Sequence, residues 1–408
     1  VDYVQVNRKA EAVLPLLEEC AAKGVKTVQL FTAGFSESGF PERAALEAEI
    51  LERARQAGIR LIGPNCMGFV NTRAGVSYMR GMPQEPGPVG LICQSASISE
   101  HVVIFGSLRG LRFGVVFNQG NAVDINEAEL MEYFARDPAT ELVGVYLEGV
   151  REGRRFFHAL KEAATRKPVV IYKGGQTEAG GRAVYGHTAS LAGTIEVFDG
   201  LCRQAGAVRA RSLDEMLDVL VALRFMALDC MKVPQGPGVA ALGIGGGASV
   251  RAADELEAGG LRLPPLPRET QEALWGLTPV PGNSLRNPID AVTLLKPDYL
   301  REAIRIVAGA PGIDTVLFHL GFGPRWGPRG RGFHRPPLDE TLAALTEARQ
   351  LTDKPIVLAI LPPWEPEALE ELHSMQEGFW RAGFPVFHSL ERAARAISYL
   401  LDWRARRD

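Results

Sequence analysis

The chain has 408 residues, of which 46% are hydrophobic and 23% are charged, and its formal net charge at pH 7 is −3. This composition is typical of a globular protein of two or three domains, and the charge balance gives no electrostatic reason to expect binding to nucleic acid or to a membrane. The five cysteines have neither CxxC nor metal-ligand spacing, which predicts reduced thiols in a cytoplasmic protein and no metal site. No apolar run is as long as a membrane span, and no signal-peptide pattern opens the sequence.

The first segment, residues 1–80, predicts a partial Rossmann-like unit. The expected elements alternate between helix and strand, at residues 9–23, 25–31, 43–57 and 59–62. The unit therefore opens in a helix and has only two clear strands, and no glycine-rich turn precedes Val25. Because ligands bind beyond the carboxyl ends of parallel strands, we expect the loops that start at Thr32 and Gly63 to lie at the functional edge.

The second unit, residues 86–232, follows a linker rich in proline and glycine. Strands are predicted in chain order at residues 89–93, 113–117, 143–147 and 168–172. The loops that follow them should share one edge of one parallel sheet, and they cover residues 94–97, 118–124, 148–153 and 174–190. The first of these loops leads into a helix from about Ile98, whose N-terminus can hold an anion through its amides and dipole, or can simply be capped.

The last of the four loops contains glycine at positions 174, 175, 180, 181 and 186, followed by one histidine, His187. Glycine lets backbone amides approach a ligand, and successive amides can form an anion-binding concavity. An imidazole there can attack phosphorus, because its neutral nitrogen is available near pH 7. Glu148, at the end of a neighbouring strand, can fix the tautomer of such an imidazole. The alternatives are a surface loop with an incidental histidine, and a glutamate that faces solvent or caps a helix.

The third unit, residues 236–408, repeats the second. Short matches occur in the same order in both, and they pair residues 239–249 with 89–97, 286–290 with 120–124, 315–320 with 142–147, 354–358 with 167–171, and 382–391 with 205–214. This order predicts two copies of a flavodoxin-like, doubly wound parallel-sheet domain. The later copy has no counterpart of His187, but it offers a glycine-rich helix start at residues 245–249.

The sequence resembles a known protein family. The motifs that carry the resemblance occur in order and read Gly63-Pro-Asn-Cys-Met-Gly68, Asn118-Gln-Gly-Asn-Ala-Val-Asp124, Tyr146-Leu-Glu-Gly149 and Gly186-His-Thr-Ala-Ser-Leu-Ala-Gly193. They are similar to those of the NDP-forming acyl-CoA synthetases, relatives of succinyl-CoA synthetase, and in particular of the ADP-forming acetyl-CoA synthetase α subunit. Two loops replace a glycine of the family pattern by alanine, at Ala96 and Ala189, and we expect an altered fit with retained chemistry.

The resemblance implies a role for several groups of residues. It implies that His187 is phosphorylated and that Glu148 orients it. It implies coenzyme A binding by the first unit, at Ala33, Gly34, Phe35, Pro64 and Asn65. It implies phosphate binding at two helix N-termini, at Gln94, Ser95, Ala96, Gly245, Gly246 and Gly247. The expected acyl-binding residues lie in the matched loops of the two copies, at Asn121, Asp124, Asn287 and Asp290.

The resemblance also implies a reversible reaction in three steps. Acyl-CoA and phosphate give acyl phosphate and CoA, the histidine takes the phosphoryl group and frees the carboxylic acid, and the phosphohistidine passes the group to ADP. No ATP-grasp segment is recognisable in the sequence, so ADP or ATP with Mg²⁺ is expected on a β-type ATP-grasp subunit or on a missing domain, in an oligomer. Two alternatives remain: a non-catalytic regulatory subunit that binds CoA or acyl-CoA, and a CoA ligase of the citrate-lyase type.

Overall fold

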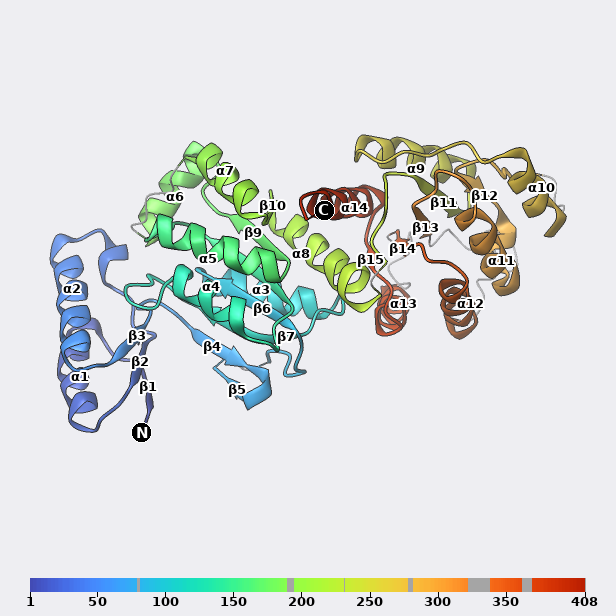
Figure 1. Cartoon of the computed structure of the whole chain (residues 1–408). Coiled ribbons are helices and arrows are strands. Elements are labelled where there is room, and N and C mark those ends of the chain that lie inside the picture. The colour runs from blue at the N-terminus through green and yellow to red at the C-terminus, as the bar shows by residue number, and fades with distance from the viewer. Residues whose placement is uncertain are drawn as a thin grey trace. The chain divides into compact units, whose positions relative to one another are not determined.

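The structure is a computed structural model that describes residues 1–407 except 79–80, 189–193, 231, 278–281, 322–337 and 362–368, and only the backbone of residues 185–188. The chain divides into two compact units, one comprising Val1–Ser107 and Leu111–Leu217, the other Leu108–Gly110 and Asp218–Asp408 (Figure 1). Among the described residues, no helix combines the length and the apolar character that crossing a membrane requires.

The N-terminal part of the first unit contains a three-stranded parallel sheet. Its strands lie in the order β1 (Tyr3–Val6), β2 (Thr27–Leu30) and β3 (Arg60–Ile62). Helices α1 (Val13–Ala22) and α2 (Pro41–Gln56) contact each other beside it, and the short helices η1 (Ala10–Ala12) and η2 (Ser36–Ser38) precede them (Figure 1). The prediction that this unit opens in a helix was wrong, because β1 is a short strand of which only Val6 is buried.

The second sheet of this unit has seven strands, in the order β10-β9-β8-β6-β7-β4-β5. Their bounds are β4 (Gly68–Asn71), β5 (Val76–Ser77), β6 (Val89–Cys93), β7 (Phe113–Asn118), β8 (Leu142–Leu147), β9 (Val169–Lys173) and β10 (Val208–Ala210). The strands from β6 to β10 are parallel and have the flavodoxin-like order 2-1-3-4-5. The antiparallel strands β4 and β5, which the sequence pattern did not predict, extend the sheet beyond β7.

Six α-helices follow in the chain: α3 (Ala96–Ser107), α4 (Glu127–Arg136), α5 (Gly153–Arg166), α6 (Glu178–Thr188), α7 (Ile195–Ala205) and α8 (Leu213–Ala222). Helices α4, α5 and α7 bury their apolar faces on one side of the sheet in a common core, and α4 and α5 lie side by side (Figure 1). Helix α3 packs against β6 and β7. A 3-10 helix η3 (Thr72–Ala74) and a π-helix η4 (Leu223–Asp229) complete these elements.

The glycine-rich segment before His187 is helical, which corrects the predicted loop over residues 174–190. Helix α6 begins at Glu178, and the Thr177 hydroxyl caps it by accepting from the Gly180 amide at 3.1 Å. Val184 is buried on its inner side. A threonine cap followed by Glu178 is a helix-start signal, and the cap and the burial of Val184 offset part of the cost of the glycines, each about 1 kcal/mol relative to alanine.

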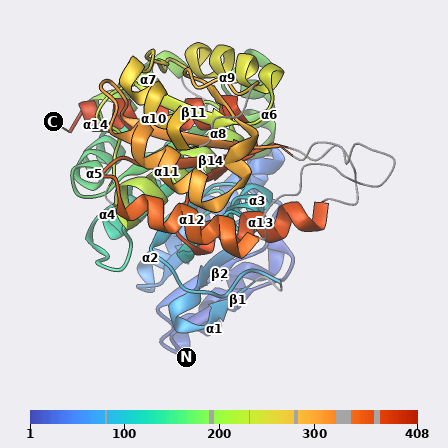
Figure 2. The ribbon, with the colours of Figure 1, turned by 90° about the vertical axis from the view of Figure 1, so that its right-hand side faces the viewer.

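The second unit repeats this architecture with five parallel strands in the order β12-β11-β13-β14-β15, again 2-1-3-4-5. The strands are β11 (Val239–Gly243), β12 (Ile289–Asp290), β13 (Thr315–Leu320), β14 (Ile356–Ile360) and β15 (Val386–Phe387). The helices are α9 (Gly246–Ala258), α10 (Arg268–Leu277), η5 (Val292–Leu295), α11 (Pro297–Ala308), α12 (Leu338–Gln350), α13 (Leu369–Arg381) and α14 (Leu390–Ala405). Helices α11, α12 and α13 pack in sequence, whereas α9 packs against α14 (Figure 2). The predicted α/β class with doubly wound parallel sheets is confirmed.

The two copies differ where their first and third strands end. In the second copy a Cβ atom added to Gly243 would lie 1.9 Å from Cε1 and from Nε2 of His319, so the imidazole occupies the place of a side chain. His319 is only 2% exposed, and burial lowers the pKa of its imidazole to about 4, which keeps it neutral near pH 7. In the first copy the paired positions hold Cys93 and Tyr146.

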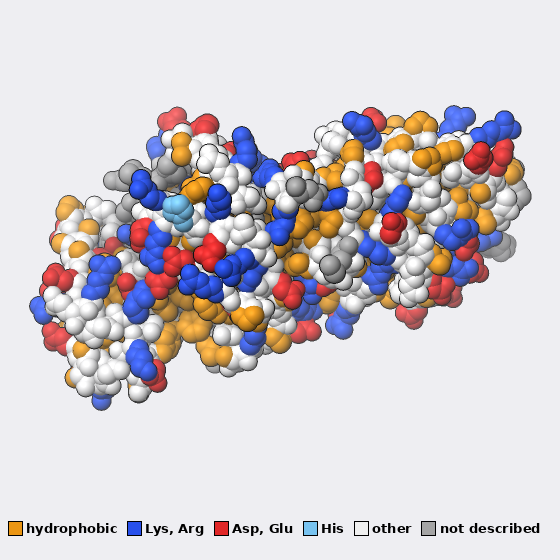
Figure 3. Space-filling model, viewed as in Figure 1, with side chains coloured by type: hydrophobic (Ala, Val, Ile, Leu, Met, Phe, Trp, Pro, Cys, Tyr) orange, Lys and Arg blue, Asp and Glu red, His pale blue; other side chains and the backbone are white. Residues whose placement is uncertain are grey.

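Charged side chains of both signs are interspersed over the face of the molecule seen in Figure 3. This distribution agrees with the small net charge of −3. On that face no broad region of a single sign would attract a polyanion.

Candidate active site

The carboxyl ends of β6, β8 and β9 bring three predicted loops together. The register pairs Cys93 with Tyr146 and Leu147 with Lys173, so Gln94, Glu148 and Gly174 follow at one edge of the sheet. The Gln94 side chain is 5% exposed, and its Oε1 accepts from the backbone amides of Glu148 at 2.7 Å and of Gly149 at 3.0 Å. Gln94 therefore fixes the turn that presents Glu148.

Glu148 is a buried carboxylate, 5% exposed, with a tyrosine as a neighbour on its own strand. The hydroxyl of Tyr146 donates to Glu148 Oε1 at 3.2 Å, as expected for residues two apart on one face of a strand. Burial and the adjacent Glu148 raise the pKa of the Tyr146 phenol above its ordinary value, so it keeps its proton and acts as a donor. Side-chain alternation along β8 could have identified Tyr146 from the sequence.

Lys173 adds a buried cation to the same edge. Its side chain is 2% exposed, and Nζ donates to the carbonyl oxygens of Glu148 at 2.7 Å and Gly174 at 2.8 Å. Burial, with a smaller contribution from Arg209, lowers the pKa of the ammonium to about 8, while Glu148 opposes the shift. Lys173 thus clamps the turn after β8 to the segment that leads into α6. A lysine that ends an otherwise apolar strand was the sequence signal for this position.

The start of helix α3 lies beside Gln94 and completes this part of the site. The first amides of a helix have no acceptor within the helix, and its dipole favours an anion at this end. The hydroxyls of Ser95 and Ser97 lie 3.2 Å apart, and the Cys93 thiol donates to the Ser95 carbonyl at 3.0 Å. Burial raises the pKa of the Cys93 thiol, so it stays protonated. The predicted phosphate-binding residues Gln94, Ser95 and Ala96 therefore adjoin Glu148.

The position of His187 is described only for its backbone, which belongs to the last turn of α6. Its side chain lies outside the described part of the structure, as does that of Thr188, while Ala189 is not described at all. The pairing of His187 with Glu148 therefore stays a prediction. Helix α6, whose last turn carries His187, starts four residues after Gly174. Lys173 holds Gly174 at the carboxyl edge of the sheet by donating to its carbonyl oxygen.

The loops expected to bind CoA meet at Asn121. Its Nδ2 donates to a carboxylate oxygen of Glu37 at 2.7 Å and of Glu47 at 2.9 Å, and its Oδ1 lies 3.5 Å from the side-chain Nδ2 of Asn65. Within the first loop, Glu37 Oε1 accepts from the backbone amides of Gly34 at 2.6 Å and Phe35 at 3.1 Å. Phe35 and Pro64 are buried and hold the loops, whereas Ala33 is exposed and Asn65 is half-buried. Ala33 and Asn65 are therefore the predicted CoA-binding residues at which these loops are most accessible to a ligand.

Asp124 has structural partners in the same region. Its Oδ2 accepts from the backbone amide of Leu61 and from Nε of Arg60, both at 2.9 Å. The Arg60 guanidinium also binds both carboxylate oxygens of Glu129, at 2.9 and 2.8 Å. Asp124 therefore links β3, an edge strand of the three-stranded sheet, to the loop that precedes α4.

We expect the change Asp124→Ala to lower the free energy of unfolding by about 1–3 kcal/mol, because it leaves the Leu61 amide without its acceptor. Urea denaturation of the purified chain measures this loss. Glu132→Ala is the matched control, since Glu132 pairs with Arg155 near the surface and its loss should cost about 0.2–1 kcal/mol. Equal destabilisation by both changes would remove Asp124 from this structural role.

The corresponding residues of the second unit form a separate group. Asp290 Oδ1 accepts from the Gly245 amide at 2.6 Å, directly before α9, which begins at Gly246. Asn287 is bound to backbone atoms through its whole amide: it donates to the carbonyls of Val239 and Pro264 and accepts from Ala241. Gly247 has no atom within 4 Å of an added Cβ, so this helix start is open on that side. Among the described residues, no group of three or more His, Cys, Asp and Glu side chains could hold a metal ion.

The sequence and the fold are similar to those of known proteins. The model of the succinyl-CoA ligase-like flavodoxin domain matches residues 86–223, and that of a CoA-binding domain matches residues 1–72. These matches assign the two segments to a domain of the succinyl-CoA ligase-like flavodoxin class and to a CoA-binding domain.

Individual relatives identify the family to which the whole chain belongs. The α subunit of ADP-forming acetate–CoA ligase I from Pyrococcus furiosus is 32% identical over 99% of this chain and 83% of its own length. The α subunit of ligase II from the same organism is 35% identical over 78% of the chain and 68% of its own length. An acetyl-CoA synthetase from Candidatus Korarchaeum cryptofilum, solved with phosphate and ADP, is 26% identical over the whole chain and 83% of its own chain, with a TM-score of 0.79. The chain belongs to the family of NDP-forming acyl-CoA synthetases, as an α-type subunit.

Proposed function

We propose that this chain carries the phosphorylated histidine of an enzyme that interconverts acyl-CoA, phosphate and ADP with a carboxylic acid, CoA and ATP. The observation that supports this most is the buried carboxylate of Glu148, which accepts from the Tyr146 hydroxyl and lies on a turn whose backbone Gln94 and Lys173 hold beside the N-terminus of α3. A buried carboxylate held by defined contacts is poised to orient an imidazole, and a helix N-terminus favours a phosphoryl group. The three proposed domains are residues 1–80, 86–232 and 236–408.

Each step moves one group. An oxygen of phosphate attacks the thioester carbonyl, the C–S bond breaks, and CoA leaves with a proton as acyl phosphate forms. A ring nitrogen of His187 then attacks phosphorus, the bond to the acyl oxygen breaks, and the carboxylate departs. Finally an oxygen of ADP attacks phosphorus and the N–P bond breaks, giving ATP. Helix N-termini and the Lys173 ammonium stabilise the migrating charge electrostatically.

The other parts of the chain take the remaining roles. The surface around Ala33 and Asn65, with Gly34, Phe35 and Pro64 behind it, holds CoA. Gln94, Ser95 and Ala96 hold the phosphoryl group on one side, and Gly245, Gly246 and Gly247 offer a second helix start for it. Four cysteines are buried as thiols, which suits a protein of the reducing cytoplasm.

We also propose that the nucleotide binds to an ATP-grasp partner subunit, because the sequence has no Gly-x-x-x-x-Gly-Lys-[Ser/Thr] loop to hold its phosphates. The purified chain alone should bind Mg-ADP weakly in a calorimetric titration and form no ATP from acyl-CoA, phosphate and ADP. Addition of the nucleotide-binding subunit should restore ATP formation. Tight nucleotide binding together with turnover by the lone chain would contradict the partner requirement. Absence of turnover with the partner, for every acyl-CoA tried, would favour a regulatory subunit.

A further inference from the structure

The turn that presents Glu148 is held at both of its ends. At its start, Gln94 and Lys173 bond to the backbone around Glu148. At its other end, the backbone amide of Arg151 donates to Glu127 Oε1 at 2.7 Å, and Glu127 is the first residue of α4 and only 1% exposed. The backbone of Arg151 is therefore fixed relative to Glu148, which lies three residues earlier in the chain.

The side chain of Arg151 reaches a neighbouring loop. Arg151 is exposed, and its Nε donates to the carbonyl oxygen of Asn121 at 2.8 Å. A charged donor makes a stronger hydrogen bond than a neutral one, and the planar guanidinium gives this bond a defined direction. Arg151 therefore ties the turn after β8 to the loop after β7.

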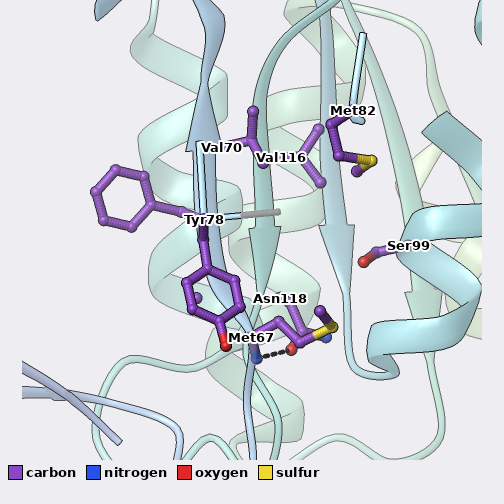
Figure 4. Close-up of a pocket in the computed structure, with 9 residues that line it drawn as sticks. Met67, Val70, Tyr78, Met82, Ser99, Val116 and Asn118 are labelled. Atoms are coloured by element: carbon purple, nitrogen blue, oxygen red, sulfur yellow. Dashed lines mark hydrogen bonds between the residues drawn. The ribbon is translucent and has the colours of Figure 1, made fainter. Parts of the chain in front are cut away.

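The loop that contains Asn121 is fixed at its start and is bonded to the predicted CoA-binding loops. At its start, Asn118 Oδ1 accepts from the Met67 amide at 2.7 Å (Figure 4). Farther along, the backbone amide of Asn121 donates to the Pro64 carbonyl at 3.0 Å, and its side chain donates to Glu37 at 2.7 Å. The carbonyl that holds Arg151 thus belongs to a residue that both CoA-binding loops contact.

These bonds continue into the first CoA-binding loop. The Glu37 carboxylate accepts from the Gly34 amide at 2.6 Å, and Gly34 is one of the residues expected to bind CoA. A continuous series of hydrogen bonds therefore runs from the Gly34 amide to the Arg151 guanidinium. Helix α6, which carries His187 in its last turn, also lies against η2, to which Glu37 belongs. Networks of this kind can carry energetic coupling between two sites.

We propose, on the basis of the function proposed above, that Arg151 is a positioning residue through which bound CoA speeds the phosphorylation of His187. CoA that orders its loops also orders the Asn121 carbonyl, and the guanidinium bonded to that carbonyl restricts the movement of the turn that presents Glu148. The carboxylate then spends more time in the orientation that phosphoryl transfer to the imidazole needs. The histidine is thereby charged fastest when the acceptor of the acyl group is already bound.

Formation of the phosphohistidine from γ-labelled ATP, with the nucleotide-binding subunit and without any carboxylic acid, tests this proposal. A ring nitrogen of His187 attacks the γ-phosphorus and ADP leaves, so CoA is not a reactant in this assay. In the native chain, saturating CoA should raise the single-turnover rate at least about fivefold, the lower end of the usual coupling between sites. In Arg151→Ala the rate with CoA should equal the rate without it. Arg151→Lys keeps a cationic donor and should restore part of the increase.

Arg154→Ala is the matched control, because Arg154 is an exposed arginine near the start of α5 and its loss should leave the CoA effect unchanged. The CoA effect should also disappear in Glu148→Gln, and adding Arg151→Ala to that variant should slow it no further, since Arg151 acts through Glu148. A native chain that CoA does not accelerate, a CoA effect of native size in Arg151→Ala, or further slowing of Glu148→Gln would overturn the proposal.

A binding measurement separates this test from the proposed reaction. In the full chain labelled with ¹⁵N-arginine, CoA should shift the Nε–H signal of Arg151, which Arg151→Lys identifies. The Nε–H of Arg155 donates to Glu132 at 2.8 Å and serves as the internal reference. A shift at Arg151 without any labelling of His187 would refute the proposed function but support the link between the CoA-binding loops and Arg151. Labelling of His187 that CoA does not accelerate, with no shift at Arg151, would refute this inference alone.

Discussion

Replacement of His187 by alanine is expected to abolish phosphorylation of the chain and to lower ATP formation by a factor on the order of 10³ or more, because it removes the proposed phosphoryl acceptor. The measurement is incubation with γ-labelled ATP and the nucleotide-binding subunit, followed by peptide mapping. The label should sit at residue 187 and be lost in acid, as a phosphoramidate is.

His158→Ala is the matched control, since His158 is an exposed histidine on α5 and should not affect labelling. The fold should survive both changes, which circular dichroism and the urea midpoint can establish. Acid-stable label, or label that persists in His187→Ala, would contradict the assignment.

Replacement of Glu148 by glutamine should slow formation of the phosphohistidine on the order of 10²–10⁴-fold, the range lost with a general acid–base partner. The amide keeps the shape of the side chain and an oxygen for the Tyr146 hydroxyl, which donates at 3.2 Å in the native protein. It removes the negative charge that would stabilise an imidazolium. Rapid-quench measurement of labelled protein gives the rate directly.

Stability distinguishes a chemical role of Glu148 from a structural one. The urea midpoint of Glu148→Gln should equal that of the native chain. The bonds from Gln94 and Lys173 go to backbone atoms around Glu148, and the substitution leaves these atoms in place. Glu141→Gln, an exposed change one residue before β8, should alter neither the rate nor the stability. A native phosphorylation rate in Glu148→Gln would exclude Glu148 from the mechanism.

Strands were recognisable in the sequence where they are buried on both faces. Strand β8 is buried at every position from Leu142 to Leu147, and its apolar run stands out. Strands β1, β4 and β5 have two to four residues and are not buried throughout, β1 and β5 lie at sheet edges, and β4 lies next to β5, so their pairing partners define them. Helix α6 was not predicted for a different reason. Its glycines are typical of a loop, and the capping residue Thr177 was a weaker signal than these glycines.

The candidate site was predictable as far as strand order determines it. The ends of β6, β8 and β9 had to share an edge, and Gln94 and Glu148 do so. The partners of Asn121 and Asp124 were not predictable, because Glu47 and Arg60 lie 74 and 64 residues away in the sequence. Such contacts join the three-stranded sheet and α2 to the loop that follows β7, and no local sequence pattern encodes them.

The packing of His319 against Gly243 makes these two positions interdependent. A side chain at Gly243 would meet the imidazole at 1.9 Å, whereas the first copy has Cys93 and Tyr146 at the paired positions. A larger residue at position 243 therefore requires a change at position 319 as well, and the effects of the two substitutions on stability should not add.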